Sequence, residues 1–171
     1  MQAVMKRLLL ATALGVVAVG VHAQSSRQPA APAIDVWPVR DNVFMLVGAG
    51  GNTTVQVGAD GVLVVDTKLV AGGEPLLAAI RALSAEPIRY IINTHAHPDH
   101  VGGNAIIAAA GNTIAGGNVS GTIGDASEGA AVLAQENVLV RMSGATPSPP
   151  FAAWPTDTFI DGHKDLFFNG E

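Results

Sequence analysis

The stretch Thr94-His95-Ala96-His97-Pro98-Asp99-His100 carries the strongest indication of fold and chemistry in this chain. His95 and His97 are two positions apart, so in an extended segment both rings leave the same side of the backbone. Asp99 and His100 follow at once, where we expect Pro98 to bend the chain away from regular structure. Imidazoles and a carboxylate are ligands of zinc and similar divalent metals. The stretch therefore predicts a metal site with four ligands: His95, His97, Asp99 and His100.

The composition limits the classes of protein to be considered. The chain has 171 residues, of which 49% are hydrophobic and 13% charged, as expected of one folded domain. Its formal net charge of -5 argues against a nucleic-acid partner. The sequence contains no cysteine, so neither a disulfide nor a thiolate ligand is available.

The first residues have the pattern of a targeting segment. Lys6 and Arg7 precede an apolar run over residues 8–21, and Val21-His22-Ala23 fits a cleavage site. We predict a signal peptide over residues 1–23 and a flexible lead-in over residues 24–33. The apolar run is shorter than the ~20 residues of a membrane span, so we expect a periplasmic or secreted protein without a stable span. The alternative is an uncleaved anchor.

Short strand-like runs dominate the next part of the chain. They cover residues 34–39, 42–47, 53–57 and 62–65, with a turn predicted at Asp60-Gly61, and together predict an antiparallel meander. Apolar residues at helical spacing then predict a helix that starts around Pro75 and ends at Pro87. Residues 88–92 predict a buried strand with the metal motif at its C-terminal end.

The second part of the chain predicts further alternation of helices and strands. We expect a helix over residues 104–110 capped by Gly111, a brief strand over 113–115, and a helix over 130–142. A loop over 143–150 precedes a hairpin formed by residues 158–160 and 166–168. This order predicts a mixed α/β layered domain.

The motif favours two metals over one. His95 and His97 would share the first metal, whereas Asp99 and His100 point elsewhere and would bind a second. Asp99 is also the candidate catalytic residue, as a general base that orients water; the alternative is a purely structural ligand. Asp66 is expected to accept a hydrogen bond from a ligand histidine; the alternative is an ordinary turn residue at the end of a strand. Lys68 is expected at the surface, with a substrate anchor as the alternative.

The chain resembles the metallo-β-lactamase superfamily from about Asn42 onward. The resemblance is carried by the run over residues 61–67, by the motif over residues 94–100, and by Gly102-Gly103-Asn104. It implies an αββα sandwich with a metal-dependent hydrolase site at one edge. It also implies a first zinc on His95 and His97 and a second on Asp99 and His100. His100 and the lack of cysteine are similar to the third lactamase subclass, glyoxalase II-like thioesterases and broad-specificity exported hydrolases.

The same resemblance implies that the sandwich is incomplete. The family draws further ligands from a second half, including a histidine in a His-Thr context, and we interpret residues 34–171 as the N-terminal part of such a domain. His163 is expected to be an ordinary surface histidine. One half of a sandwich would leave an apolar sheet face uncovered.

Three functional hypotheses remain open from the sequence. The first is an exported zinc-dependent hydrolase that uses a metal-bound hydroxide on an amide, ester or thioester, with two zinc ions in the intact protein. The second is a catalytically incomplete metal-binding half-domain. The third is iron-dependent sulfur oxidation on the same ligands. The sequence does not identify the substrate or the oligomeric state.

Overall fold

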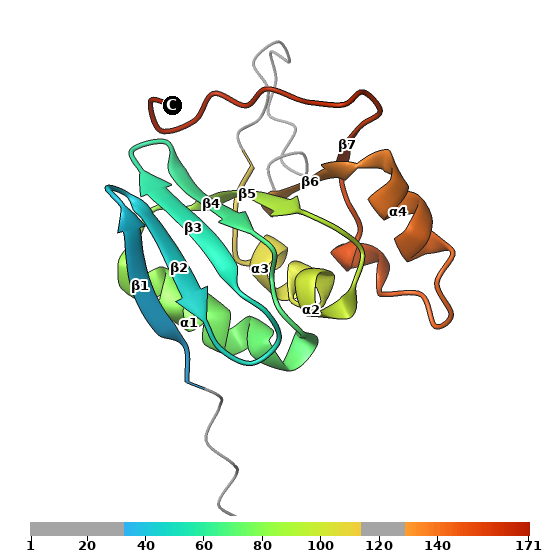
Figure 1. Ribbon diagram of the computed structural model, residues 1–171, viewed down its shortest axis with the longest axis horizontal. Helices are drawn as coiled ribbons and strands as arrows, with labels where there is room; N and C mark the ends of the chain where they lie inside the picture. Colours follow the sequence, from blue (N-terminus) through green and yellow to red (C-terminus); the bar gives the residue numbers. More distant parts are fainter. Residues whose placement is uncertain (1–32, 114–128) are drawn as a thin grey trace, which may run out of the picture.

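The computed structural model describes residues 33–113 and 129–171, which form one seven-stranded sheet with strand order β1-β2-β3-β4-β5-β6-β7. The predicted signal peptide and nearly all of the predicted lead-in lie outside these residues. The first four strands pair antiparallel, and the last three add in parallel. The mixed α/β class predicted from the sequence is confirmed (Figure 1).

The predicted meander is present. It consists of β1 (Asp35–Arg40), β2 (Val43–Val47), β3 (Thr53–Gly58) and β4 (Gly61–Val65). The turn between β3 and β4 is one residue earlier than predicted: Gly58 pairs with Gly61, so Ala59 and Asp60 form the loop. Gly61 has φ +132°, and a Cβ there would lie 2.6 Å from the Pro87 carbonyl oxygen. Only glycine fits that position without strain.

Helix α1 (Gly73–Leu83) packs on one face of this meander. Leu76 and Ile80 are fully buried in the main core, together with strand residues such as Val62 and Val64. The helix ends four residues before Pro87, because Ser84 turns to an extended conformation after donating its N–H to Ile80. The prediction that Pro87 itself ends the helix is therefore wrong.

Strand β5 (Ile88–Asn93) lies beside β4 and runs parallel to it. It leads into α2 (Pro98–Val101) and α3 (Asn104–Ala109), which lie on the same side of the sheet as α1 (Figure 1). Ala110, not Gly111, is the C-cap of α3. A Cβ on Gly111 would lie 2.5 Å from the Ile88 carbonyl oxygen, so glycine here allows the chain after α3 to approach the backbone of β5 closely. The predicted strand over 113–115 falls largely outside the described residues.

The predicted helix over residues 130–142 is wrong in its first half. Ala131–Gln135 is strand β6, parallel to β5, and only Glu136–Ser143 is helical, as α4. A run of five apolar residues, from Ala130 to Ala134, does not distinguish a buried strand from a helix by periodicity. Here Val132, Leu133 and Ala134 are all buried, as is typical of a strand covered on both faces.

The predicted C-terminal hairpin is also wrong. Strand β7 (Asp157–Phe159) pairs in parallel with β6, and residues 166–168 form no strand. Phe168 instead packs edge-on against Tyr90, with ring centroids 5.2 Å apart. Asn169 donates its N–H to Asp60 Oδ2 at 2.7 Å, so the C-terminal segment lies against the β3–β4 turn (Figure 1). These contacts replace the strand pairing that the turn signal predicted.

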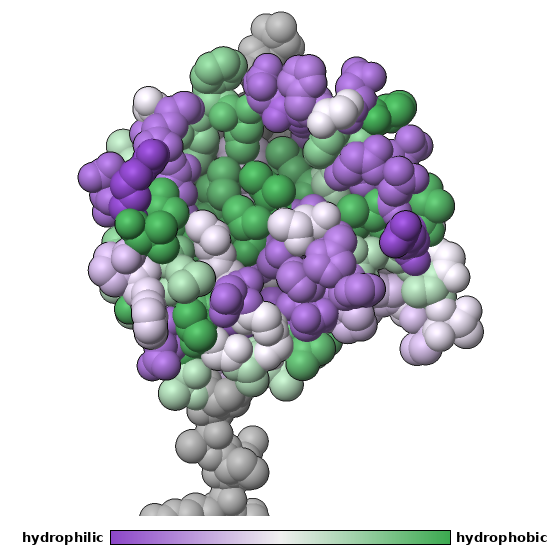
Figure 2. All heavy atoms as spheres, viewed as in Figure 1, coloured by the Kyte–Doolittle hydropathy of each residue, from purple (hydrophilic) through white to green (hydrophobic). Residues whose placement is uncertain are grey.

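The face of the sheet opposite the main core is apolar and only partly covered. Met45, Leu63 and Val65 alternate with core residues along their strands and are half-buried. Figure 2 shows an apolar area in the middle of the face seen in Figure 1. Within the described residues this apolar face is therefore partly covered, whereas an uncovered face was expected of one half of a sandwich. None of the helices in those residues is long and apolar enough to cross a bilayer.

Candidate metal centre

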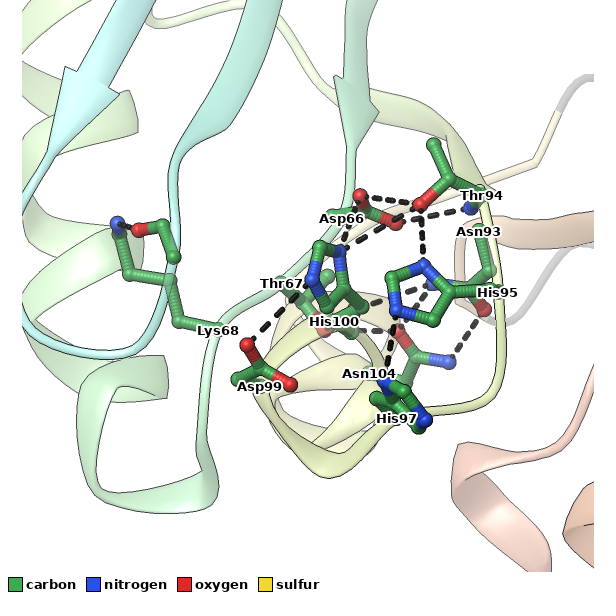
Figure 3. Close-up of polar contacts among 11 residues, drawn as sticks. Asp66, Thr67, Lys68, Asn93, Thr94, His95, His97, Asp99, His100 and Asn104 are labelled. Atoms are coloured by element: carbon green, nitrogen blue, oxygen red, sulfur yellow. Dashed lines mark hydrogen bonds and ion pairs between the residues drawn. The ribbon is translucent and has the colours of Figure 1, made fainter.

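The predicted ligands lie on the segment that follows β5, at the C-terminal edge of the parallel part of the sheet (Figure 3). His97 is extended, with φ -70° and ψ 145°, and is the N-cap residue of α2. Pro98 occupies the first turn of that short helix, where its missing N–H has no cost. Pro98 therefore starts helical structure, whereas the sequence had predicted a bend away from it.

His95 and His97 form the first pair of candidate ligands. His95 Nε2 lies 3.1 Å from His97 Nδ1, and the ring centroids are 4.6 Å apart. Two nitrogens bound to one tetrahedral zinc at about 2.0–2.1 Å are about 3.3 Å apart. The pair therefore has the spacing of two ligands of one ion.

Asp99 and His100 form the second pair. Asp99 Oδ2 lies 3.4 Å from His100 Nε2, again close to the spacing of two ligands on one zinc. The His100 ring is not remote from the first pair, because its centroid lies 3.9 Å from that of His95. The expectation that Asp99 and His100 point elsewhere is thus wrong for His100: the two pairs are neighbours.

Asp66, the residue that follows β4, holds the imidazole of His100 in the second pair. Its Oδ2 lies 2.7 Å from His100 Nδ1, and the same oxygen accepts a hydrogen bond from Thr94 Oγ1 at 2.7 Å. The other carboxylate oxygen accepts the Thr94 N–H at 2.9 Å. With Nδ1–H donating to Asp66, His100 presents the Nε2 lone pair toward Asp99. The predicted contact between Asp66 and a ligand histidine is present.

A buried amide network that the sequence did not indicate supports the same region. Asn104 donates to Asn93 Oδ1 at 2.7 Å and to the Ala153 carbonyl at 2.8 Å. Its own Oδ1 accepts from Thr67 Oγ1 at 2.8 Å and from Asn93 Nδ2 at 3.1 Å. Thr67 N also donates to the His100 carbonyl at 2.8 Å. The only sequence signal was the position of Asn104 after two glycines, which does not reveal its partners.

Lys68 is the largest departure from the sequence prediction. It was expected at the surface, yet its side chain is 0% exposed and is among the largest fully buried ones. Its ammonium donates a short hydrogen bond to the Gly51 carbonyl. Burial lowers the pKa of Lys68 below its usual range. Lys68 has φ +64° and Asp66 has φ +62°, a conformation that costs non-glycine residues about 1–3 kcal/mol each.

The ligand set fits zinc as two partial sites. Each pair supplies two ligands at suitable spacing, whereas a zinc ion takes about four. Residues 33–113 and 129–171 contain no group of three or more His, Cys, Asp or Glu side chains that could hold one metal ion. His163, as expected, is exposed. Each ion would therefore need further ligands beyond its pair.

Comparison with solved structures gives the same fold. A metallo-beta-lactamase of Cronobacter sakazakii, described by its HARLDQ motif, is 24% identical with a TM-score of 0.58, covering 82% of this chain and 51% of its own. A metallo-beta-lactamase from Pontibacter korlensis is 15% identical, with a TM-score of 0.54 and coverage of 80% and 57%. BJP-1, a subclass B3 metallo-beta-lactamase of Bradyrhizobium japonicum, is 19% identical, with a TM-score of 0.53 and coverage of 80% and 49%.

The chain therefore spans about half the length of the solved structures that it matches. In the HARLDQ motif, arginine and glutamine stand where this chain has His97 and His100. None of the curated proteins compared with this chain matches it significantly. The family model of the metallo-beta-lactamase superfamily matches residues 46–170, which include both candidate ligand pairs and Asp66. This chain, with part of the fold and the ligand motif at its sheet edge, belongs to the metallo-beta-lactamase superfamily.

Proposed function

We propose that this chain is the ligand-bearing part of an exported zinc-dependent hydrolase that cleaves an amide, ester or thioester in a small-molecule substrate. The observation that supports this most is the adjacency of two ligand pairs, with contacts of 3.1 Å and 3.4 Å. Two neighbouring cations at such a site suit a reaction in which negative charge develops on a carbonyl oxygen. Superfamily membership supports the same class of chemistry.

The roles of the residues follow from their contacts. His95 Nε2 and His97 Nδ1 would hold a first zinc, and Asp99 with His100 Nε2 a second. Bound zinc would lower the pKa of water to about 7 and polarise the substrate carbonyl. Asp99 is partly exposed, so its carboxylate is open to solvent and able to orient a water and accept its proton. Asp66 keeps His100 in the orientation that leaves Nε2 free.

Export is part of the proposal and rests on the N-terminal sequence alone. Residues 1–23 have the charge and apolar pattern of a signal peptide, and residues 24–33 the composition of a linker. We place the mature protein in the periplasm or outside the cell. Mass spectrometry of the mature N-terminus would locate the cleavage site, expected after Ala23.

The test of the hydrolase begins with metal binding. Metal-free chain is titrated with Zn²⁺ and, separately, with Co²⁺, whose visible spectrum reports imidazole and carboxylate ligation. The complete protein, with the segment that supplies the further ligands, is then loaded with zinc and assayed on a β-lactam, a lactone and a thioester. We expect metal binding that His95→Ala weakens and His163→Ala leaves unchanged, and turnover of at least one substrate. A complete, zinc-loaded protein that leaves all three substrates untouched would remove the hydrolase assignment.

A second candidate is a metal-binding domain without turnover. It is favoured by one observation: among the described residues, no three potential ligands converge on one point. This candidate predicts weak binding of a single metal and no hydrolysis. Sequencing the DNA downstream of codon 171 separates the two candidates, because an in-frame segment with a His-Thr pair and later Asp and His would supply the remaining ligands that the hydrolase requires.

A further inference from the structure

Three consecutive residues after β4 contact three different parts of the candidate metal centre. Asp66 binds the His100 imidazole, and Thr67 binds the His100 carbonyl. Lys68 points away from both and binds the Gly51 carbonyl in the loop between β2 and β3 (Figure 3). The backbone of Lys68 is itself held, because its carbonyl accepts the Gly103 N–H at 3.2 Å. One short segment thus joins the glycine loop to the helical turn that carries Asp99 and His100.

Gly51 lies directly against the second ligand pair. A Cβ on Gly51 would lie 3.4 Å from the Asp99 carbonyl oxygen, 3.8 Å from Asp99 Oδ2 and 3.9 Å from His100 Nε2. About one methyl group would therefore fill the space between Gly51 and the atoms that would bind the second metal. Gly50 and Gly51 both have φ +79°, a glycine-favoured conformation that gives this loop little stiffness of its own.

The burial of Lys68 calls for an explanation other than packing. A fully buried lysine is rare unless its ammonium is paired, because the charged group loses its hydration. A methionine of similar length would fill the same volume without that cost. Gly72 lies alongside the stem, since a Cβ there would lie 3.2 Å from Lys68 Cβ. The side chain is therefore enclosed along its length, and its donor group ends at the loop carbonyl.

We infer that Lys68 is a positioning residue that holds the glycine loop over residues 48–52 against Asp99 and His100, and so sets the affinity of the second metal position. The loop contact depends only on the geometry described above. Its consequence for metal affinity rests on the proposed metal-dependent function. Lys68 is not a ligand, because its ammonium points toward Gly51 and away from the histidines (Figure 3).

The first test compares the full chain with Lys68→Met, which keeps the aliphatic stem and removes the donor. Lys164→Met is the matched control, because Lys164 pairs with Asp157 at 2.5 Å, away from the loop. Hydrogen exchange of the metal-free proteins is measured for peptides covering residues 48–53 and for β4 and β5. We expect exchange in residues 48–53 to rise about tenfold or more in Lys68→Met, with β4 and β5 unchanged. Equal exchange in residues 48–53 would overturn the inference.

The second test separates the effect of the Lys68 ammonium on the loop from the effect of the volume of the side chain. The chain has no cysteine, so Lys68→Cys introduces a unique thiol. Alkylation of the unfolded protein with 2-bromoethylamine restores an ammonium at that position, whereas iodoacetamide adds a neutral group. After refolding, the ammonium form should regain slow exchange over residues 48–53 and the neutral form should not. Equal protection in both forms would show that Lys68 only fills space.

Metal titration then tests the consequence. With Co²⁺, Lys68→Met should lose about tenfold in affinity at the Asp99–His100 position and keep the His95–His97 position unchanged. A loosened loop with unchanged affinity at both positions would overturn the metal part of the inference. A wild-type protein that binds no metal would instead contradict the proposed function, and the exchange data would still decide the loop contact.

In wild-type protein, a nuclear Overhauser effect between the Lys68 side chain and Gly51 tests the contact without any variant, and its absence would refute it.

Discussion

Asp66 Oδ2 lies 2.7 Å from His100 Nδ1, and this contact determines which nitrogen of His100 faces Asp99. Because Asp66 also accepts the Thr94 N–H and hydroxyl, its carboxylate links the end of β4 to the start of the ligand segment. The candidate centre is therefore built across two neighbouring parallel strands. Substitutions that remove the hydrogen bonds of the Asp66 carboxylate should lower metal affinity more than they disturb the fold.

Asp66→Ala should weaken metal binding by about 10–100-fold, because the His100 ring loses the acceptor that fixes its tautomer and orientation. Isothermal titration with Zn²⁺ measures the change, and Asp157→Ala, in an ion pair with Lys164, is the control. Metal binding at wild-type affinity in Asp66→Ala would show that Asp66 is only a residue of the strand-end turn.

His97→Ala should abolish binding at the first metal position and nearly all hydrolysis, since His95 alone supplies a single ligand there. The visible spectrum of the Co²⁺ protein should lose one component, while the component from Asp99 and His100 remains. His163→Ala, at an exposed position, should leave both components intact. Loss of both components in His97→Ala would mean that the two positions do not bind independently.

Asn104→Ala should lower the free energy of unfolding by roughly 1–3 kcal/mol for each buried polar group left without a partner. The groups that lose their donor are Asn93 Oδ1 and the Ala153 carbonyl, whereas Thr67 Oγ1 and Asn93 Nδ2 keep the His100 carbonyl as an acceptor. Urea unfolding followed by circular dichroism gives the value. Asn137→Ala, at an exposed position on α4, is the control, and equal stability of the two variants would argue against a structural role of the network.

Gly103→Ala should destabilise the protein and disturb metal binding together. A Cβ on Gly103 would lie 2.2 Å from the Thr67 carbonyl oxygen, so the start of α3 has to move away from the segment that follows β4. We expect a loss of at least about 1 kcal/mol in unfolding free energy. Gly162→Ala should be neutral, because a Cβ at Gly162 has no heavy atom within 4 Å. Thermal unfolding of the two variants tests the contrast.

The lowered pKa of Lys68 predicts a pH dependence of stability. Between the lowered pKa and the ordinary value near 10.4, the folded protein releases the proton while the unfolded chain keeps it. Unfolding then takes up a proton, so the free energy of unfolding rises with pH in that window. Urea unfolding of wild type and Lys68→Met at several alkaline pH values should show a steeper rise for wild type. Parallel curves would contradict the lowered pKa.

The sequence by itself determined the parts of the fold that depend on local patterns. Alternating runs between glycine loops predicted the meander of β1 to β4, because register in a half-buried sheet follows the apolar pattern. The spacing of His95 and His97 predicted that their rings meet, since an extended segment places alternate side chains on one side. The position of the motif after a buried strand predicted the edge at which the candidate centre lies.

The tertiary structure decided what depends on contacts between distant segments. Residues 131–135 form a strand because β5 offers an open parallel edge, which the local apolar run does not reveal. Residues 166–168 form no hairpin strand; Phe168 packs on Tyr90 and the next residue, Asn169, donates to Asp60. Lys68 is buried because Gly51, 17 positions earlier, presents a carbonyl to its ammonium. In each case the free energy comes from a partner far away in the sequence, so no local pattern contains it.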